Sequence, residues 1–377
     1  MMSAGLTGLT TEPAHRSTGR GTATADLGPE ALIPALVGAG YLSPADAIWR
    51  NVEFVPVGRS HPVYQLLLDG KPHVAVKLFG PWRGETDGEV ARERAVQSLA
   101  AELNELARLL PPALVPDPPA AGHKVPDGLV VSGWFDGIPA WEGDAISLGA
   151  GDPAADLIDL AERVVAPLAA MHRAAGRLVH AGRLPAALKG PPPWGLRLFD
   201  GDAPAELWRH PVLGPLLARV GADRAIVTGM RRARGAWRPV TLVHADLKHD
   251  NLLLARDGRL AVVDWEMARA GDPAWDLAGL MLRPLLAPDG GGWSEDNQAA
   301  AAHLLRRYAR SPAAQRPLAQ RLMLYCGAWV VVSLLQYCSV AATPDEEGIA
   351  RSLAVARTCA TDGERLVTRL LERCGGD

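Results

Sequence analysis

The sequence predicts an α+β fold of two lobes, with a small β-rich N-lobe and a larger, mostly helical C-lobe. Three observations lead to this prediction. Short apolar runs typical of strands are concentrated in the first third of the 377-residue chain. Helical periodicity dominates from residue 153 onward. A short β-rich stretch at residues 240–264 interrupts those helices, which indicates a few polar loops inside the larger lobe.

The chain divides into three predicted segments. Residues 1–27 are small, polar and rich in Gly and Thr, and they lack a signal-peptide core, so we expect a disordered N-terminal tail. Residues 28–135 form the N-lobe with a helical lead-in, and residues 136–377 form the C-lobe. A cleft between two lobes is a usual place for a ligand.

The N-lobe elements have clear local signals. Asp69-Gly70 is a hairpin-turn dipeptide between two alternating apolar runs. Thr86-x-x-Glu89 is a capping-box pattern, and the apolar positions after it predict one amphipathic helix through residue 110. The expected strands are VEFVPVG (52–58), VYQLLL (63–68), HVAVKLF (73–79) and GLVVSGWF (128–135).

Composition excludes several classes of protein. A net charge of -3 argues against nucleic acid as the main partner, because phosphate-binding surfaces usually need a basic excess. The four cysteines have no CxxC spacing, which is typical of reduced thiols in a cytoplasmic protein. The apolar segment 322–342 is long enough to cross a membrane but contains Gly, Ser and Gln, so we expect a buried helix and no membrane partner.

The stretch at 240–264 predicts a metal site. NLLLA (251–255) and LAVVD (260–264) are apolar runs separated by the turn sequence RDGR. If all four turn residues form the loop, Asn251 pairs with Asp264, with Cβ atoms about 5 Å apart. An amide oxygen and a carboxylate at that separation suit Mg²⁺, which prefers oxygen ligands.

The loop entering this hairpin carries a carboxylate and a rare lysine. The chain has only five lysines, and one of them is Lys248, two residues after Asp246. A carboxylate here can accept a hydroxyl proton, and a lysine beside it can neutralise charge on a transferring phosphoryl group. These two residues are the predicted catalytic pair.

The spacing of these residues resembles a known family. Asp246-Leu-Lys-x-x-Asn251, the His-x-Asp before it, and Asp264-x-Glu266 followed by GDPAWDL (271–277) occur in this order. Together they resemble the aminoglycoside phosphotransferase and choline-kinase-like branch of the protein-kinase-like superfamily, over roughly residues 50–375. The resemblance implies a bilobal protein-kinase-like fold that uses ATP and Mg²⁺.

The resemblance also implies roles for C-lobe residues. Asp246 corresponds to the catalytic base, and Asn251 and Asp264 correspond to the metal ligands. His244 is expected to brace the catalytic loop, and Asp276 to be the buried carboxylate that holds the loop backbone. Asp272-Pro273 independently reads as a helix start, which puts Asp276 in the first helical turn.

In the N-lobe the resemblance implies a nucleotide site. Lys77 corresponds to the lysine that bridges the nucleotide phosphates and a helix glutamate. That glutamate is Glu93 by family spacing, with Glu102 as the second choice, because helical phase does not distinguish them. The phosphate loop has the single glycine Gly58, with Ser60 as a backbone donor, and adenine is expected near Ser132 and Trp134.

These residues predict an ATP-dependent phosphotransferase that acts on an alcohol hydroxyl of a small molecule, either an antibiotic or a metabolite. An alternative acceptor is a Ser or Thr hydroxyl of a ribosomally made peptide in a natural-product pathway, with a partner enzyme acting on the phosphorylated product. A non-catalytic pseudokinase is a third reading, but Lys77, Asp246 and Asp264 are all present.

Overall fold

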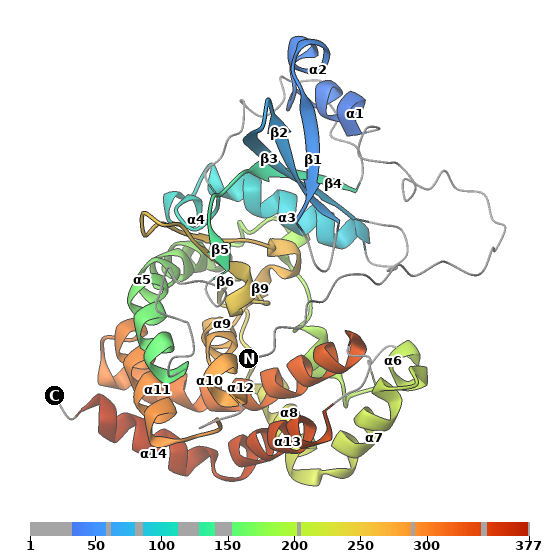
Figure 1. Ribbon diagram of the computed structural model, residues 1–377. Helices are drawn as coiled ribbons and strands as arrows, with labels where there is room; N and C mark the ends of the chain where they lie inside the picture. Colours follow the sequence, from blue (N-terminus) through green and yellow to red (C-terminus); the bar gives the residue numbers. More distant parts are fainter. Residues whose placement is uncertain are drawn as a thin grey trace, which may run out of the picture.

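The computed structural model describes residues 32–57, 62–79, 86–111, 128–139, 153–201, 205–287, 291–340 and 345–375. A twisted β-sheet with a few helices forms a small lobe above a larger helical lobe (Figure 1). The predicted bilobal α+β fold is therefore confirmed. The predicted tail at 1–27 lies outside the described residues, and the lobe boundary at 135/136 stays a prediction.

The N-lobe is built on one antiparallel sheet in the order β1-β2-β3-β4. Asp69 and Gly70 both have positive φ (52° and 74°), as the predicted hairpin requires. The strands are β1 (Val52–Pro56), β2 (Val63–Leu68), β3 (Lys71–Leu78) and β4 (Leu129–Gly133). All four predicted strands are present, with small differences at their ends.

Each face of this sheet packs against a different helix. On one face, Val74 and Val76 join a core with Leu36 of α1 (Leu32–Gly38), which precedes α2 (Pro44–Trp49). On the other face, Val130 packs with Val90 of α3 (Thr86–Ala100). Lys77 pairs with Val130 across β3 and β4, and paired residues share a face. The alternation along β3 therefore turns Lys77 toward α3.

The prediction of one continuous helix over residues 86–110 is wrong. Helix α3 ends at Ala100, Leu103 has an extended backbone (φ -117°, ψ 98°), and the short α4 (Asn104–Ala107) follows. The break brings Leu106 and Leu109 into the large C-lobe core, where both are fully buried. Tertiary burial of these leucines overrides the local helical pattern.

The C-lobe is a set of helices around the central α12 (Pro312–Val340), which packs against α8, α9, α13 and α14. The other helices are α5 (Pro153–His180), α6 (Ala205–Arg209), α7 (Leu213–Ala222), α8 (Arg224–Ala236), α9 (Pro273–Leu280), α10 (Leu282–Leu286), α11 (Glu295–Tyr308), α13 (Glu346–Thr361) and α14 (Gly363–Cys374). Short 3₁₀ turns lie at Ala186–Leu188 and Trp194–Arg197.

Among the described residues, α12 is the one helix long and apolar enough to cross a membrane. Of its most apolar window, 72% is buried inside the protein. Trp329 and Tyr325 of this helix are almost fully buried in the C-lobe core. The segment 322–342 was expected to be a buried helix, and its described part, through Val340, is one.

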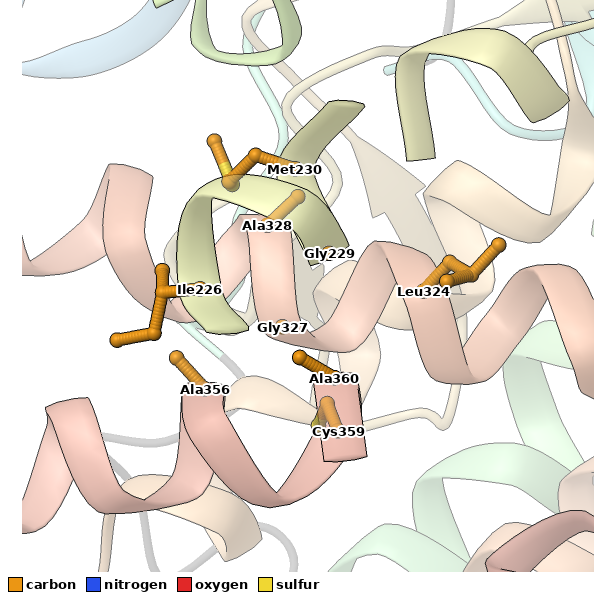
Figure 2. Close-up of a pocket in the computed structure, with 9 residues that line it drawn as sticks. All are labelled: Ile226, Gly229, Met230, Leu324, Gly327, Ala328, Ala356, Cys359 and Ala360. Atoms are coloured by element: carbon orange, nitrogen blue, oxygen red, sulfur yellow. The ribbon is translucent and has the colours of Figure 1, made fainter. Parts of the chain in front are cut away.

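A small apolar cavity lies where α8, α12 and α13 meet (Figure 2). Its volume is about 10 Å³, close to the minimum that admits one water, and aliphatic side chains and Cys359 line it. A Cβ at Gly229 would lie 2.8 Å from Ala360 Cβ, so the small residues here serve close helix packing. This cavity is too small for a substrate.

Two small sheets carry the polar loops of the C-lobe. One joins β6 (Thr241–Val243) to β9 (Arg269–Gly271). The other has the order β5-β7-β8, with β5 (Ile138–Pro139), β7 (Leu252–Leu254) and β8 (Leu260–Val262). Both sheets lie in the part of the C-lobe nearest the N-lobe (Figure 1), so the predicted catalytic loop faces the junction of the lobes.

Candidate active site

Lys77 and Glu93 form an ion pair at the junction of β3 and α3. Lys77 Nζ donates to Glu93 Oε2 at 3.1 Å, and both side chains are nearly buried. Glu102 does not reach this site, because it lies 4.0 Å from Arg183 with about two thirds of its side chain exposed. The structure therefore pairs Lys77 with the first of the two glutamates that the sequence offered.

Lys77 also contacts two carboxylates from the C-lobe. Its ammonium donates to Glu266 Oε2 at 2.7 Å and to Asp264 Oδ1. Burial alone would lower the pKa of Lys77, but the three carboxylates together raise it above its usual range. Burial raises the pKa of Glu93 to about 7, although the adjacent ammonium acts in the opposite direction. The ion cluster connects the two lobes.

Asp264 begins a strained turn after β8. It has a left-handed backbone (φ 68°, ψ 54°), which is uncommon for a residue with a side chain. The 3₁₀ turn η7 (Trp265–Met267) follows and places Glu266 two residues beyond Asp264. This backbone conformation allows both carboxylates to meet the same ammonium.

The catalytic loop is held by a buried carboxylate on α9. The side chain of Asp276 accepts hydrogen bonds from the backbone N–H of His244 at 2.9 Å and of Ala245 at 3.0 Å. Ala245 has a left-handed backbone (φ 67°), so this sharp bend is held by both bonds. His172 of α5, fully inside the core, contacts the same carboxylate at 3.2 Å.

His244 links this loop to the turn that carries Asp264. Its Nε2 lies 2.9 Å from Val263 O, and its Nδ1 lies 3.2 Å from the backbone N of Asp246. A carbonyl only accepts and a backbone N–H only donates, so the proton of His244 is on Nε2. The ring also packs against Trp265 at an angle of 59°, with centroids 4.6 Å apart. His244 therefore joins the loop to the turn that carries Asp264.

Asp246 lies at the centre of a small polar group. Lys248 Nζ is 3.0 Å from Asp246 Oδ2, and Asn251 Nδ2 donates to the same oxygen at 3.1 Å. Asn251 Nδ2 also donates to Asp246 O at 2.8 Å. Burial raises the pKa of Asp246, against the opposing effect of Lys248. The loop therefore brings a carboxylate, an ammonium and a carboxamide together.

The predicted pairing of Asn251 with Asp264 is wrong by one residue. Leu252 pairs with Val262, and Val263 N–H donates to Asn251 O at 3.0 Å, so Asn251 lies opposite Val263. Ala255 bonds Arg259 across a loop of three residues, in which Gly258 has φ +84°. Glycine adopts this left-handed conformation without strain, so a tighter loop than the predicted four residues forms.

Asn251 and Asp264 nevertheless lie at the same end of this hairpin. Asp264 is the residue after Val263, and its charge influences the pKa of both Asp246 and Lys248. The carboxamide of Asn251 uses its nitrogen toward Asp246, which leaves the oxygen as its second polar atom. The catalytic loop and the Lys77 cluster are therefore neighbouring parts of one site.

Two of the four residues predicted to contact adenine or to form the phosphate loop lie in the described part of the chain. Ser132 lies on β4 opposite Ala75 of β3, and Trp134 follows at the connection between the lobes. The indole N–H of Trp134 is buried and has no acceptor in the described part of the chain. Gly58 and Ser60 lie outside the described residues.

The oxygen donors here fit a hard cation such as Mg²⁺. Oxygens of Glu93, Asp264 and Glu266 lie within 4.8 Å of one another. The Lys77 ammonium bonds all three, so it offsets part of their negative charge in the arrangement described.

Two residues that contact this site were missed in the sequence. Glu266 is the third partner of Lys77, and the Asp264-x-Glu266 spacing was a signal for it. Arg92 donates from Nε to Glu266 O, and only its place beside Glu93 pointed to it. Every residue has a backbone carbonyl, so the sequence does not show which one accepts a hydrogen bond from a given side chain.

Comparison with known proteins agrees with this geometry. The sequence matches the profile of the phosphotransferase enzyme family over residues 51–318. A microcompartment-associated aminopropanol kinase has a similar fold (16% identity, TM-score 0.53, 85% of this chain and 93% of that chain). No sequence among the curated proteins matches this chain significantly.

Two further solved structures have the same fold. An ethanolamine kinase of Plasmodium vivax matches with 13% identity and a TM-score of 0.52, over 88% of each chain. A choline kinase of Streptococcus pneumoniae matches with 15% identity and a TM-score of 0.50, over 84% of this chain and 96% of that one.

The lobes and the site define the class of this protein as a kinase-type phosphotransferase. The family match covers well over half of the chain, and the chain belongs to the phosphotransferase enzyme family.

Proposed function

We propose that the protein transfers the γ-phosphate of ATP to an alcohol hydroxyl of a small molecule. The observation that carries this proposal is the arrangement of Asp246 and Lys248 beside the Lys77 cluster. A carboxylate that accepts a hydroxyl proton and an ammonium that faces phosphoryl oxygens are the parts such a transfer needs.

In the proposed mechanism, Asp246 orients the acceptor hydroxyl and takes its proton. Asp246 Oδ2 is already bonded by Lys248 and Asn251, whereas Oδ1 has only a 3.3 Å contact with Lys248. The hydroxyl therefore meets Oδ1. Lys248 then stabilises charge on the transferring group, and Lys77, held by Glu93, binds the phosphates of the nucleotide.

We further propose that Asn251 and Asp264 hold Mg²⁺, with Glu266 beside them. When bound, the cation would neutralise phosphate charge and align the nucleotide. Asp264 and Glu266 supply the carboxylates, and Asn251 supplies a neutral oxygen. Adenine would lie near Ser132 and Trp134, and Gly58 and Ser60 would approach the phosphates.

Small amino alcohols are the first acceptors to test. The similar solved structures are kinases of aminopropanol, ethanolamine and choline, and each of these three compounds has a single hydroxyl on a short chain. Hydroxylated antibiotics are the second group. Peptide hydroxyls and a partner enzyme stay an alternative that no feature of the described residues favours.

A cytoplasmic location suits this reaction, because ATP is available there. The four free cysteines and the buried position of α12 support it. No partner is required by the proposed chemistry beyond the two substrates.

The proposal is tested by measuring ADP release with MgATP and a panel of amino alcohols and hydroxylated antibiotics. Acceptor-dependent ADP release by the wild-type protein, lost in Asp246→Asn, is expected. Calorimetry with MgATP is the companion measurement. Absence of MgATP binding, or equal ADP release in Asp246→Asn, would reject the proposed function.

A further inference from the structure

The turn Trp265–Met267 has all three of its carbonyl groups hydrogen-bonded. Trp265 O accepts from the backbone N–H of Ala268 at 2.9 Å. Glu266 O accepts from Arg92 Nε, and Met267 O accepts from Arg269 Nε at 3.0 Å. Two of the three acceptors are therefore satisfied by arginine side chains, Arg269 of the adjacent β9 and Arg92 of α3, which is distant in the chain.

Arg92 adds a side-chain hydrogen bond to the packing of α3 against this turn. Its neighbour Glu93 reaches Asp264 and Glu266 only through Lys77, by side-chain charges. Arg92 instead holds the backbone of Glu266 directly, with a charged donor. Hydrogen bonds with a charged partner are about twice as strong as neutral ones.

Gly88 supports the position of Arg92. It lies one turn earlier on α3, and a Cβ at residue 88 would be 3.3 Å from Arg92 Nη1. The guanidinium therefore lies close beside the helix backbone at residue 88, where glycine leaves room for it. Glycine is a poor helix former, and its presence here is consistent with the room that Arg92 needs.

We propose that Arg92 is a positioning residue that fixes the turn Asp264–Met267 against α3. With the turn fixed, the carboxylates of Asp264 and Glu266 keep their direction toward the phosphates and the cation. The inference rests on the proposed function for its consequence in binding, but the contact itself is testable without nucleotide.

The first experiment is hydrogen exchange of the nucleotide-free protein, followed by mass spectrometry. Arg92→Met should raise amide exchange in the segment 264–271 about tenfold, because a charged hydrogen bond to a carbonyl is lost. Arg92→Lys keeps a cationic donor and should restore part of the protection. The melting temperature should change little in either variant.

Arg94→Met is the matched control. Arg94 lies on the same helix two residues later and donates to Leu129 O at 2.7 Å, a bond of the same kind that points to the sheet. This variant should leave exchange in 264–271 unchanged. Equal protection of 264–271 in wild type and Arg92→Met, or an equal loss in Arg94→Met, would overturn the proposal.

The second experiment measures MgATP binding by calorimetry at several Mg²⁺ concentrations. Arg92→Met should need about tenfold more Mg²⁺ for half-maximal binding, and Arg94→Met should behave as wild type. If wild type binds no MgATP while exchange in 264–271 rises in Arg92→Met, the proposed function fails and the role of Arg92 in the turn stands. If wild type binds MgATP and Arg92→Met has an unchanged Mg²⁺ requirement, Arg92 does not position the carboxylates.

Discussion

At the scale of single residues, each of the two acidic parts of the site contains one lysine. Lys248 contacts Asp246, and Lys77 contacts Glu93, Asp264 and Glu266. When all three carboxylates are ionised, the Lys77 group has two more negative charges than positive ones. That excess favours the proposed divalent cation, whereas the pair of Asp246 and Lys248 is neutral as a unit.

Replacing Asp246 by Asn should lower turnover by about 10²–10⁴-fold, because the proton acceptor is lost. Affinity for MgATP should stay within about twofold, since Asp246 is not among the proposed cation ligands. ADP release gives the turnover, and calorimetry gives the affinity. Wild-type turnover in this variant would show that another group accepts the proton.

Lys248 should act mainly on the transition state. Lys248→Met is expected to lower kcat by about 10²-fold with little change in KM for ATP, because charge on the phosphoryl oxygens is greatest during transfer. Lys248→Arg should recover part of kcat, since its planar guanidinium presents donors in other directions. Steady-state kinetics of both variants at saturating ATP measure these changes. An unchanged kcat in Lys248→Met would contradict a role of Lys248 in the transition state.

At the scale of elements, the first turn of α9 fixes the catalytic loop to the core. Asp272 caps this helix through the N–H of Ala274, and Asp276 holds the backbone of His244 and Ala245. The helix also approaches the loop closely, because a Cβ at Gly279 would lie 2.0 Å from Leu247 O. The short helix α9 therefore determines both the bend of the loop at Ala245 and how closely the loop packs against the helix at Leu247.

Asp276→Asn should lower the free energy of unfolding by about 1–3 kcal/mol, because an amide has one acceptor oxygen and one buried N–H loses its partner. Turnover should fall as well, since the bend at Ala245 is released. Urea unfolding and ADP release measure the two effects. Asp159→Asn is the control, because within the described residues Asp159 forms an exposed ion pair with Arg163 at 3.7 Å. Equal stability of the two variants would contradict the holding role of Asp276.

The elements also show what the sequence was able to predict. The N-lobe strands and the β7–β8 hairpin were predicted because alternation and turn dipeptides are local signals. The hairpin register was wrong, because Gly258 allows a three-residue loop that composition does not distinguish from a four-residue one. The break after Ala100 was missed, because burial of Leu106 and Leu109 in the other lobe is a long-range effect.

In the site, charged side chains with characteristic spacing were predictable. Asp246, Lys248 and Asn251 come together because six consecutive residues contain all three. Arg92 was not predictable, since its partner is a carbonyl 174 residues away in the chain. Sequence patterns identify the charged groups of the candidate site. They are much less able to identify the contacts that orient those groups.

At the scale of the whole molecule, the two lobes are joined by packing as well as by charge. Val96 and Leu99 of α3 belong to the same apolar core as α5 and α12, although α3 lies between the N-lobe strands β3 and β4 in the chain. Helix α3 therefore contacts both cores, through Val90 on the N-lobe side and Leu99 on the other. A movement of α3 would change the Lys77 cluster and the C-lobe surface together.

The reactivity of the four cysteines reports whether the C-lobe core becomes accessible to a reagent. Cys326, Cys338 and Cys359 are buried and Cys374 is half-buried, and all four are free. Burial raises the pKa of each thiol, to about 12 for Cys359, so less thiolate is present at a given pH. Since the thiolate is the reactive form, labelling of native protein by iodoacetamide at pH 8 should modify Cys374 first and leave the other three largely protected.

Labelling of Cys326 and Cys359 should require unfolding of the core between α12 and α13. Both should become reactive together as urea is added, at the midpoint measured by circular dichroism, whereas Cys374 should already react in native buffer and faster at pH 9 than at pH 8. MgATP should slow the labelling of the buried pair, because a ligand bound only to the folded state reduces the unfolded fraction in proportion to its saturation. Mass spectrometry of the labelled peptides measures each rate. Rapid modification of Cys359 in native buffer at pH 8, at the rate of Cys374, would mean that the α12–α13 contact opens without unfolding of the lobe.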